Sequence, residues 1–275
     1  MPASESLAPL ELLYEEDGLA HTQLPAELAR LYDGDLGLAE DCVYANFVAT
    51  IDGAVAIPAM PRSNEFIAGN SDADRFVMGL LRAFADAVLI GAGVLRASPG
   101  GTWRPDAIFP PAAPEYAELR ERLGASVAPE VAVLTGSGAI DVGHPLLAAG
   151  ALVLTSDAGA EHLDGRVPSA STVVALGPGP LIAPDIVLSA LHTRGRRRIL
   201  CEAGPHTFGG FLQTGAVDEL FLTTSPLLVG DRGPGTRFGL VEGADLTLAG
   251  THARLLSLRC HGSYLFQRYA LAGIR

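Results

Sequence analysis

Apolar residues along this chain follow two repeating patterns, which together predict an α/β fold. Short apolar runs typical of buried strands recur from residue 43 onward and are separated by turn residues. Between several of them, apolar residues recur at helical spacing, as on one face of the segment 71–84. Strands are predicted at 43–50, 86–90, 131–135, 151–155, 172–176, 198–201, 217–225, 253–260 and 262–270, and helices at 71–83, 184–192 and 205–215.

The order of these elements predicts a mixed sheet in one domain. Strands that alternate with helices favour a parallel sheet flanked by helices. The last two strands meet at His261-Gly262, which is typical of an antiparallel hairpin. We therefore expect an α/β domain over residues 43–275, with a mixed, mostly parallel sheet and a closing antiparallel C-terminal hairpin. Residues 1–42 are acidic and turn-rich, with a short helical pattern at 25–31, and are expected to form an N-terminal extension packed on the surface.

Composition restricts the partners of this protein. The 275 residues are 48% hydrophobic and carry a net charge of −12, which argues against nucleic acid as a partner. Every one of the 19 basic residues is arginine, so an anion site must use arginine, backbone amides or hydroxyls. No apolar run is long enough to cross a membrane, and the N-terminus lacks a basic secretion signal, so we expect a cytoplasmic protein without membrane contact.

The cysteines and histidines do not predict a metal site. Cys42, Cys201 and Cys260 lie far apart and share no metal or redox spacing, so we interpret them as reduced core residues. The seven histidines are scattered, without zinc-ligand spacing. We therefore expect no metal.

The most informative stretch runs from Ile199 to Gly210. Its apolar run ends in the acid Glu202, and the turn Gly204-Pro205 then begins a helical pattern, with proline at the first helical position. Free backbone N–H groups at such a helix start can hold a phosphate, and the strand end presents a carboxylate beside them. This arrangement favours an enzyme with a phosphorylated cofactor or substrate, although an ordinary strand–turn–helix connection explains it equally well.

Two further turns are ambiguous when taken alone. The turn Gly91-Ala-Gly93 follows a strand, but a dinucleotide-binding Gly-x-Gly-x-x-Gly needs a third glycine where this chain has Arg96, and no helical pattern follows. It still permits close backbone approach to a ligand. The segment Thr50-Ile-Asp-Gly53 could contact a cofactor amide or a sugar, or it could be a turn in which Asp52 binds its own backbone.

Taken in order, the motifs resemble a known family. They are Val48-Ala-Thr-Ile-Asp-Gly53, Asp86-Ala-Val-Leu-Ile-Gly-Ala-Gly93, Arg198-Ile-Leu-Cys-Glu-Ala-Gly-Pro205, and Val217-Asp-Glu-Leu220 with Ser225-Pro-Leu-Leu-Val-Gly230. This series resembles the reductase domain of the riboflavin-biosynthesis pyrimidine deaminase-reductases and their stand-alone relatives, over roughly residues 43–270. The resemblance implies a dihydrofolate reductase-like fold, a homodimer, and NADPH-dependent reduction of a ribosyl side chain on a phosphorylated pyrimidine.

The resemblance also implies roles for particular residues. Thr50 would lie near the nicotinamide and the substrate, and Glu202 would face the substrate as a proton donor or a positioning group. The remaining cofactor contacts would come from Gly91, Gly93, Thr135, Gly204, Pro205, His206 and Thr207. The remaining substrate contacts would come from Asn46, Asp52, Ser63 and Arg104.

Several positions depart from the family pattern. The family often has Lys where this chain has Asn46, Thr where it has Val94, and an Asp-rich turn where it has Ser98-Pro-Gly100. We therefore expect a reductase acting on a pyrimidine- or pteridine-type ring other than the standard one. The alternatives are a non-catalytic NADPH-binding paralogue and a dihydrofolate reductase-like activity on a pterin. The zinc motif of the family's deaminase is missing from residues 1–42, so we expect no deaminase activity.

Overall fold

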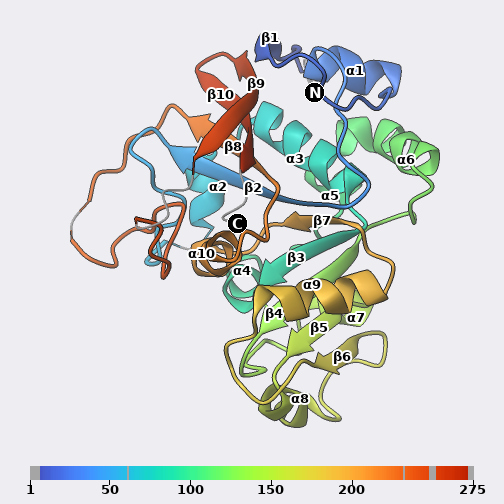
Figure 1. Ribbon diagram of the computed structural model, residues 1–275, viewed down its shortest axis with the longest axis vertical. Helices are drawn as coiled ribbons and strands as arrows, with labels where there is room; N and C mark the ends of the chain where they lie inside the picture. Colours follow the sequence, from blue (N-terminus) through green and yellow to red (C-terminus); the bar gives the residue numbers. More distant parts are fainter. Residues whose placement is uncertain (1–6, 61, 232, 248–251, 272–275) are drawn as a thin grey trace, which may run out of the picture.

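Ten strands of the described part of the chain join in one sheet, in the order β1-β9-β10-β8-β2-β7-β3-β4-β5-β6 (Figure 1). The computed structural model describes residues 7–60, 62–231, 233–247 and 252–271. The strands are β1 (Glu11–Glu15), β2 (Cys42–Thr50), β3 (Ala87–Gly91), β4 (Glu130–Thr135), β5 (Leu152–Thr155), β6 (Thr172–Ala175), β7 (Arg198–Cys201), β8 (Glu219–Ser225), β9 (Ala253–His261) and β10 (Tyr264–Leu271).

The pairing confirms the mixed sheet expected from the sequence. Strands β8, β2, β7, β3, β4, β5 and β6 pair in parallel with one another, because helical crossovers return the chain to the same edge. The C-terminal hairpin β9–β10 is antiparallel and is joined to the parallel part through β8. Parallel strands bury both faces, which explains the continuous apolar runs in the sequence.

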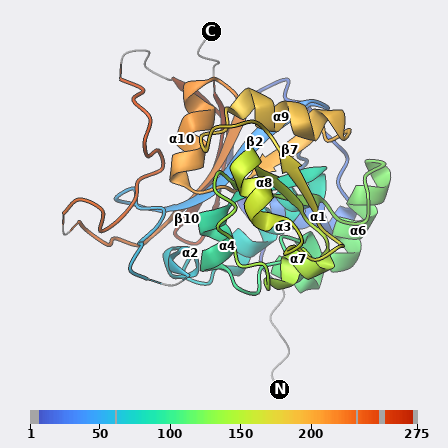
Figure 2. The same ribbon diagram turned by 90° about the horizontal axis from the view of Figure 1, so that it is seen from below.

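Helices cover the sheet on opposite faces (Figure 2). They are α1 (Ala26–Tyr32), α2 (Ser63–Ile67), α3 (Asp72–Phe84), α4 (Ala92–Ala97), α5 (Pro105–Ile108), α6 (Ala113–Arg122), α7 (Pro145–Ala149), α8 (Asp157–Leu163), α9 (Pro184–Thr193) and α10 (Pro205–Gln213), with a 3₁₀ turn at Pro110–Ala112. One core lies under α3 and α6, and a second lies under α9 and α10. None of the helices in the described ranges is both long and apolar enough to span a membrane.

The N-terminal segment is more deeply integrated than expected. Strand β1 pairs antiparallel with β9, and Leu28, Leu31 and Leu36 are buried in the same core as α3. The buried guanidinium of Arg259 on β9 donates to the carbonyl of Tyr32 at 2.7 Å. The expectation that this extension packs only on the surface is therefore wrong, because its partners lie more than two hundred residues away in sequence.

Several short helices were also missed. Helix α4 follows β3 directly, although no helix was expected after Gly91-Ala-Gly93, and α5 lies where no helix was predicted. These helices are too short to show a full apolar period. The longer helices α3, α9 and α10 were predicted within two residues of their observed ends.

Candidate active site

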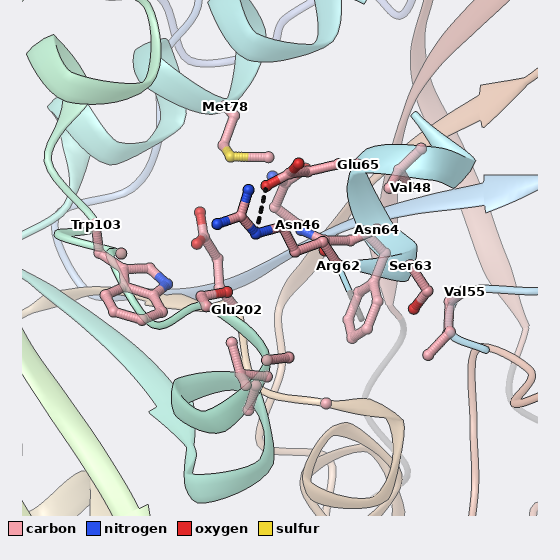
Figure 3. Close-up of a pocket in the computed structure, with 18 of the residues that line it drawn as sticks. Asn46, Val48, Val55, Arg62, Ser63, Asn64, Glu65, Met78, Trp103 and Glu202 are labelled. Carbon is pink, nitrogen blue, oxygen red and sulfur yellow. Dashed lines mark ion pairs between the residues drawn. The ribbon is translucent and has the colours of Figure 1, made fainter. Parts of the chain in front are cut away.

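A cavity of about 760 Å³ opens at the carboxyl ends of the central parallel strands (Figure 3). Its walls come from β2, the ends of β3 and β7, one side of α3, the short helices α2 and α4, and the first turn of α10. Ligand sites of open α/β sheets form at the same edge, because there the loops diverge above the strand ends. The cavity size suits a ligand larger than a single ring.

The predicted phosphate site lies in this cavity. Gly204, Pro205, His206 and Thr207 line it, and Gly204 is the residue that precedes the first turn of α10, with Pro205 at the first helical position. The amides of the first helical turn have no acceptor within the helix, so they are available to a ligand anion. That this turn binds a phosphate stays a prediction.

The glycines of β3 and α4 extend the same wall. Gly91 and Gly93 line the cavity, and a Cβ atom at Gly93 would meet no atom within 4 Å. At Gly91 the nearest atom to such a Cβ would be the Thr207 hydroxyl, at 3.5 Å. The two glycine turns therefore face a shared space, in which a cofactor could approach the backbone closely.

The predicted acid Glu202 is held by a buried arginine. The Nε and Nη2 atoms of Arg82 on α3 donate to the two carboxylate oxygens of Glu202 at 2.9 and 2.7 Å. The Arg82 and Glu202 side chains are each only 9% exposed, and both line the cavity. A two-point ion pair of this kind fixes the orientation of the carboxylate.

A second carboxyl group that lines the cavity belongs to Asp74, which lies on α3, the same helix as Arg82. It is 5% exposed, and its carboxyl is hydrogen-bonded by the hydroxyl of Thr223 on β8. Burial raises the pKa of Asp74 to about 6, although the Thr223 hydrogen bond and the nearby Arg75 oppose this effect. The two largely buried carboxyl groups of the cavity, Asp74 and Glu202, are thus in different electrostatic environments.

The Thr50-Ile-Asp-Gly53 turn lies outside the cavity lining. The Thr50 hydroxyl donates to Asp52 at 2.5 Å and accepts from the Ala54 amide at 2.9 Å. Asp52 also accepts from the Gly230 amide and from Arg237, each at 2.8 Å. The hydrogen bond from Thr50 is the main reason that the pKa of Asp52 falls to about 2. These contacts join the turn to the loop after β8 rather than to the cavity.

The other predicted substrate contacts separate into two groups. Asn46 of β2 and Ser63 of α2 line the cavity, and so do Val94 and Ser98, which depart from the family pattern. Arg104 lies outside the lining and pairs with Asp106 at 3.0 Å. Thr135, predicted to bind the cofactor, is buried at the end of β4, where its neighbour Leu134 contributes to the cavity instead.

Sequence reasoning missed the contribution of α3. Asp74, Met78 and Arg82 are spaced four residues apart, so they form one stripe along the helix, and all three line the cavity. The signal was present, since two charged residues lie at helical spacing next to an apolar face. Trp103 was not among the predicted site residues, yet it is 4% exposed, lines the cavity and adopts φ 51°. An aromatic residue in this left-handed conformation is unusual.

Charged groups near the cavity come from α2 as well. Arg62 and Glu65 form an ion pair at 3.9 Å and reach into the cavity (Figure 3). Their side chains are 60% and 54% exposed, so the pair contributes little to stability. Across the described ranges, no cluster of three histidine, cysteine or acidic residues could hold a metal ion.

This sheet, with a cavity bounded by glycine turns and buried carboxyl groups, is typical of α/β enzymes that bind a nucleotide. The chain belongs to the RibD C-terminal domain family, whose model matches residues 41–263. The resemblance inferred from the motifs is therefore confirmed. No curated protein matched the sequence.

Solved structures show the same fold. A pyrimidine reductase-like protein from Corynebacterium diphtheriae is 23% identical, with a TM-score of 0.63 over 85% of this chain and 92% of that one. The Saccharomyces cerevisiae riboflavin biosynthesis reductase Rib7 is 11% identical, with a TM-score of 0.56 over 86% and 93%. A Thermotoga maritima diaminohydroxyphosphoribosylaminopyrimidine deaminase/5-amino-6-(5-phosphoribosylamino)uracil reductase is 18% identical, with a TM-score of 0.60 over 85% of this chain and 57% of that one. This chain thus spans little more than half of the Thermotoga protein.

Proposed function

We propose that this protein is an NADPH-dependent reductase of a pyrimidine- or pteridine-type substrate. The observation that carries the proposal is the continuity of the cavity, which joins the glycine-bordered start of α10 to the buried polar groups Glu202, Arg82 and Asp74. One end suits the phosphates of a cofactor, and the other suits the polar edges of a heterocycle. Membership of the RibD C-terminal domain family supports a reductase of the riboflavin-pathway type.

The residues present fit a dinucleotide. Gly91, Gly93 and Gly204 leave the backbone accessible, and the first turn of α10 would hold the pyrophosphate through its amides. Arg62 and Arg75 also line the cavity, so a chain of strongly negative charge still offers cations to an anionic ligand. A bound dihydronicotinamide would supply the hydride. The preference for NADPH over NADH rests on the family resemblance.

Glu202 positions the substrate in the proposed reaction. Both of its oxygens accept hydrogen bonds from Arg82, and their remaining lone pairs can accept from a substrate N–H or O–H. Asn46 can donate and accept from the neighbouring strand. Buried Trp103 adds an apolar wall that excludes water from this part of the cavity.

A second candidate is a non-catalytic NADPH-binding paralogue. Asn46, Val94 and Ser98 favour it, because all three face the cavity where the family often has other residues. A dihydrofolate reductase-like activity on a pterin is compatible with the same cavity. Cytoplasmic location and a homodimer remain predictions from the sequence and its resemblance.

Calorimetric titration of the purified protein with NADPH and with NADH is the first test. We expect saturable binding, tighter for NADPH, followed by NADPH oxidation when 5-amino-6-(5-phosphoribosylamino)uracil or a pterin is added. Absence of binding by both nucleotides contradicts the proposal. Tight binding without oxidation across a panel of pyrimidines and pterins favours the non-catalytic paralogue.

A further inference from the structure

Of the carboxyl groups that line the cavity, those of Asp74 and Glu202 are the two that are largely buried, and their surroundings suit them to different roles. Glu202 accepts two charge-assisted hydrogen bonds from Arg82, at 2.9 and 2.7 Å. Both oxygens of Glu202 are thus already engaged by one guanidinium, which suits this group to positioning a ligand rather than to passing on a proton. The sequence alone had left open whether Glu202 donates a proton or positions the substrate.

We propose that Asp74, rather than Glu202, is the carboxyl that passes a proton to the substrate during reduction, an assignment that rests on the proposed function. Asp74 lines the same cavity as Glu202 and is 5% exposed, so bulk water reaches it poorly. Its position is fixed from two sides. The Ser71 hydroxyl accepts from the Asp74 backbone amide at 3.3 Å, and the Thr223 hydroxyl hydrogen-bonds the carboxyl.

The charged groups around Asp74 leave it without a tight ionic partner. On its own helix, Arg75 binds Asp72 at 2.9 Å and Asn70 at 3.0 Å, and Arg82 binds Glu202. The negative charge of Glu202, which follows β7, disfavours a second carboxylate nearby. The group facing Asp74 from β8 is the neutral hydroxyl of Thr223. Burial, the dominant effect, raises the pKa of Asp74 to about 6.

The geometry of α3 places Asp74 on the same wall of the cavity as Arg82, the partner of Glu202. Asp74, Met78 and Arg82 form one stripe on α3, which runs along the sheet face that carries Asn46 and Thr223. A ligand bound between the stripe and that face would meet the Arg82–Glu202 pair at one end and Asp74 at the other. Such a pair of carboxyl groups, one charged and one able to carry a proton, is a common division of acid and positioning roles.

The chemical step balances with Asp74 as donor. A bound dihydronicotinamide would supply hydride to the carbon of a polarised C=N or C=O bond, whose π electron pair would move to the nitrogen or oxygen. That atom takes the proton of the Asp74 carboxyl, and the O–H bond breaks. The substrate gains two electrons and two hydrogens, the nicotinamide is left oxidised, and the Asp74 carboxylate regains a proton from solvent.

The first test measures the proton on Asp74 without using activity. Carbon-13 NMR of protein labelled at the aspartate carboxyl carbons is followed against pH, and the Asp74 signal is the one missing in Asp74→Asn. We expect this signal to titrate near pH 6, and to titrate at higher pH in Thr223→Val, where the hydrogen bond that favours the carboxylate is gone. A titration below pH 4.5, close to the ordinary aspartate value, overturns the proposal.

The second test is the pH profile of NADPH oxidation with 5-amino-6-(5-phosphoribosylamino)uracil. We expect kcat to fall about tenfold per pH unit above the Asp74 pKa. This falling limb of the pH profile should move to higher pH in Thr223→Val. Asp74→Asn should lower kcat roughly 100-fold or more and abolish the limb. Asp72→Asn is the matched control, because it removes the same charge from the same helical turn, outside the cavity lining.

A wrong donor role for Asp74 and a wrong proposed function give different results. Unchanged kcat and an unchanged pH limb in Asp74→Asn overturn the donor role while leaving the reductase intact. No oxidation by the wild-type protein at any pH with any pyrimidine or pterin of the panel overturns the proposed function, and the donor role with it.

Discussion

The guanidinium of Arg82 and the carboxylate of Glu202 meet through two hydrogen bonds, although 120 residues separate them in sequence. The pair joins helix α3 to the end of β7 at the wall of the cavity. The pair therefore both stabilises the fold and lines the candidate active site, so its disruption should lower stability and activity.

Glu202→Gln should destabilise the protein by about 3–5 kcal/mol, because it leaves the buried Arg82 cation without its counter-charge. The NADPH dissociation constant should stay nearly unchanged, since the phosphate site at α10 is separate, whereas kcat should fall strongly. Urea unfolding, NADPH titration and turnover measure the three effects.

Glu118→Gln is the control for this prediction. It removes an ion pair with Arg122 whose side chains are 50% and 41% exposed, and it should cost less than about 0.5 kcal/mol. If Glu202→Gln is as stable as Glu118→Gln, the buried pair does not hold α3 against β7. If NADPH affinity and turnover fall together, Glu202 does not belong to the substrate end of the cavity.

The raised pKa of Asp74 predicts a pH-dependent stability. Its folded-state pKa of about 6 exceeds the ordinary value of 3.8, so the folded protein binds more protons than the unfolded chain between about pH 4 and 6. The stability contribution of this group therefore falls as pH rises through that window, by up to about 3 kcal/mol. Asp74→Asn, which cannot ionise, should gain stability relative to wild type between pH 4 and 7 in urea unfolding.

The same unfolding series with Asp72→Asn provides the comparison. Asp72 is 64% exposed, and its substitution should show no such gain across this range. A stability difference between Asp74→Asn and wild type that stays constant with pH would mean that the Asp74 carboxyl is ionised in the folded protein throughout.

The ionised carboxylate of Asp52 should hold the loop that follows β8 in place. Its carboxylate accepts from the Gly230 amide and from Arg237, and its pKa is lowered to about 2. The stabilisation is therefore present above about pH 4 and is lost as pH falls through 2. Asp52→Asn should increase hydrogen exchange at the Val229 and Gly230 amides at neutral pH.

Asp245→Asn is a suitable control for Asp52, since Asp245 caps the nearby Thr247 amide and its loss should leave Val229 and Gly230 protected. Unchanged exchange in Asp52→Asn would show that the turn is held by its backbone alone.

A methyl group at Gly204 should weaken cofactor binding without unfolding the protein. Gly204 has φ −67°, which alanine adopts freely, and a Cβ there would lie 3.9 Å from Val94 on the cavity wall. Gly204→Ala should raise the NADPH dissociation constant at least about tenfold, which corresponds to about 1.4 kcal/mol. The melting temperature should not change.

Gly210→Ala, on the same helix, is the matched control, because its Cβ would meet nothing within 4 Å and it lies outside the cavity lining. It should leave NADPH affinity intact. Equal affinity for Gly204→Ala and wild type would place the cofactor elsewhere.

Local patterns predicted the parts of the structure that depend on neighbouring residues. The apolar face of α3 and the Gly204-Pro205 helix start are encoded within one or two turns, and the structure has both. Strand β1 was missed because an edge strand with exposed side chains is stabilised by pairing with β9 rather than by its own sequence.

The candidate site was predicted only in part, for a related reason. Glycine turns and the acid at a strand end carry local signals, so Glu202 and Gly204 could be found. The partnership of Glu202 with Arg82 and that of Asp74 with Thr223 join segments more than 100 residues apart, and no spacing rule reveals them. Arg104 was expected at the substrate but pairs with its neighbour Asp106, which sequence alone did not indicate.

The central claim is that this cavity binds NADPH and delivers its hydride to a pyrimidine or pteridine. The most direct measurement is the loss of NADPH absorbance on mixing the protein with 5-amino-6-(5-phosphoribosylamino)uracil and, in parallel, with dihydropterins. The account predicts oxidation of one NADPH per molecule of reduced product for at least one compound. The claim is contradicted if NADPH does not bind, or if NADPH binds tightly but none of these compounds oxidises it.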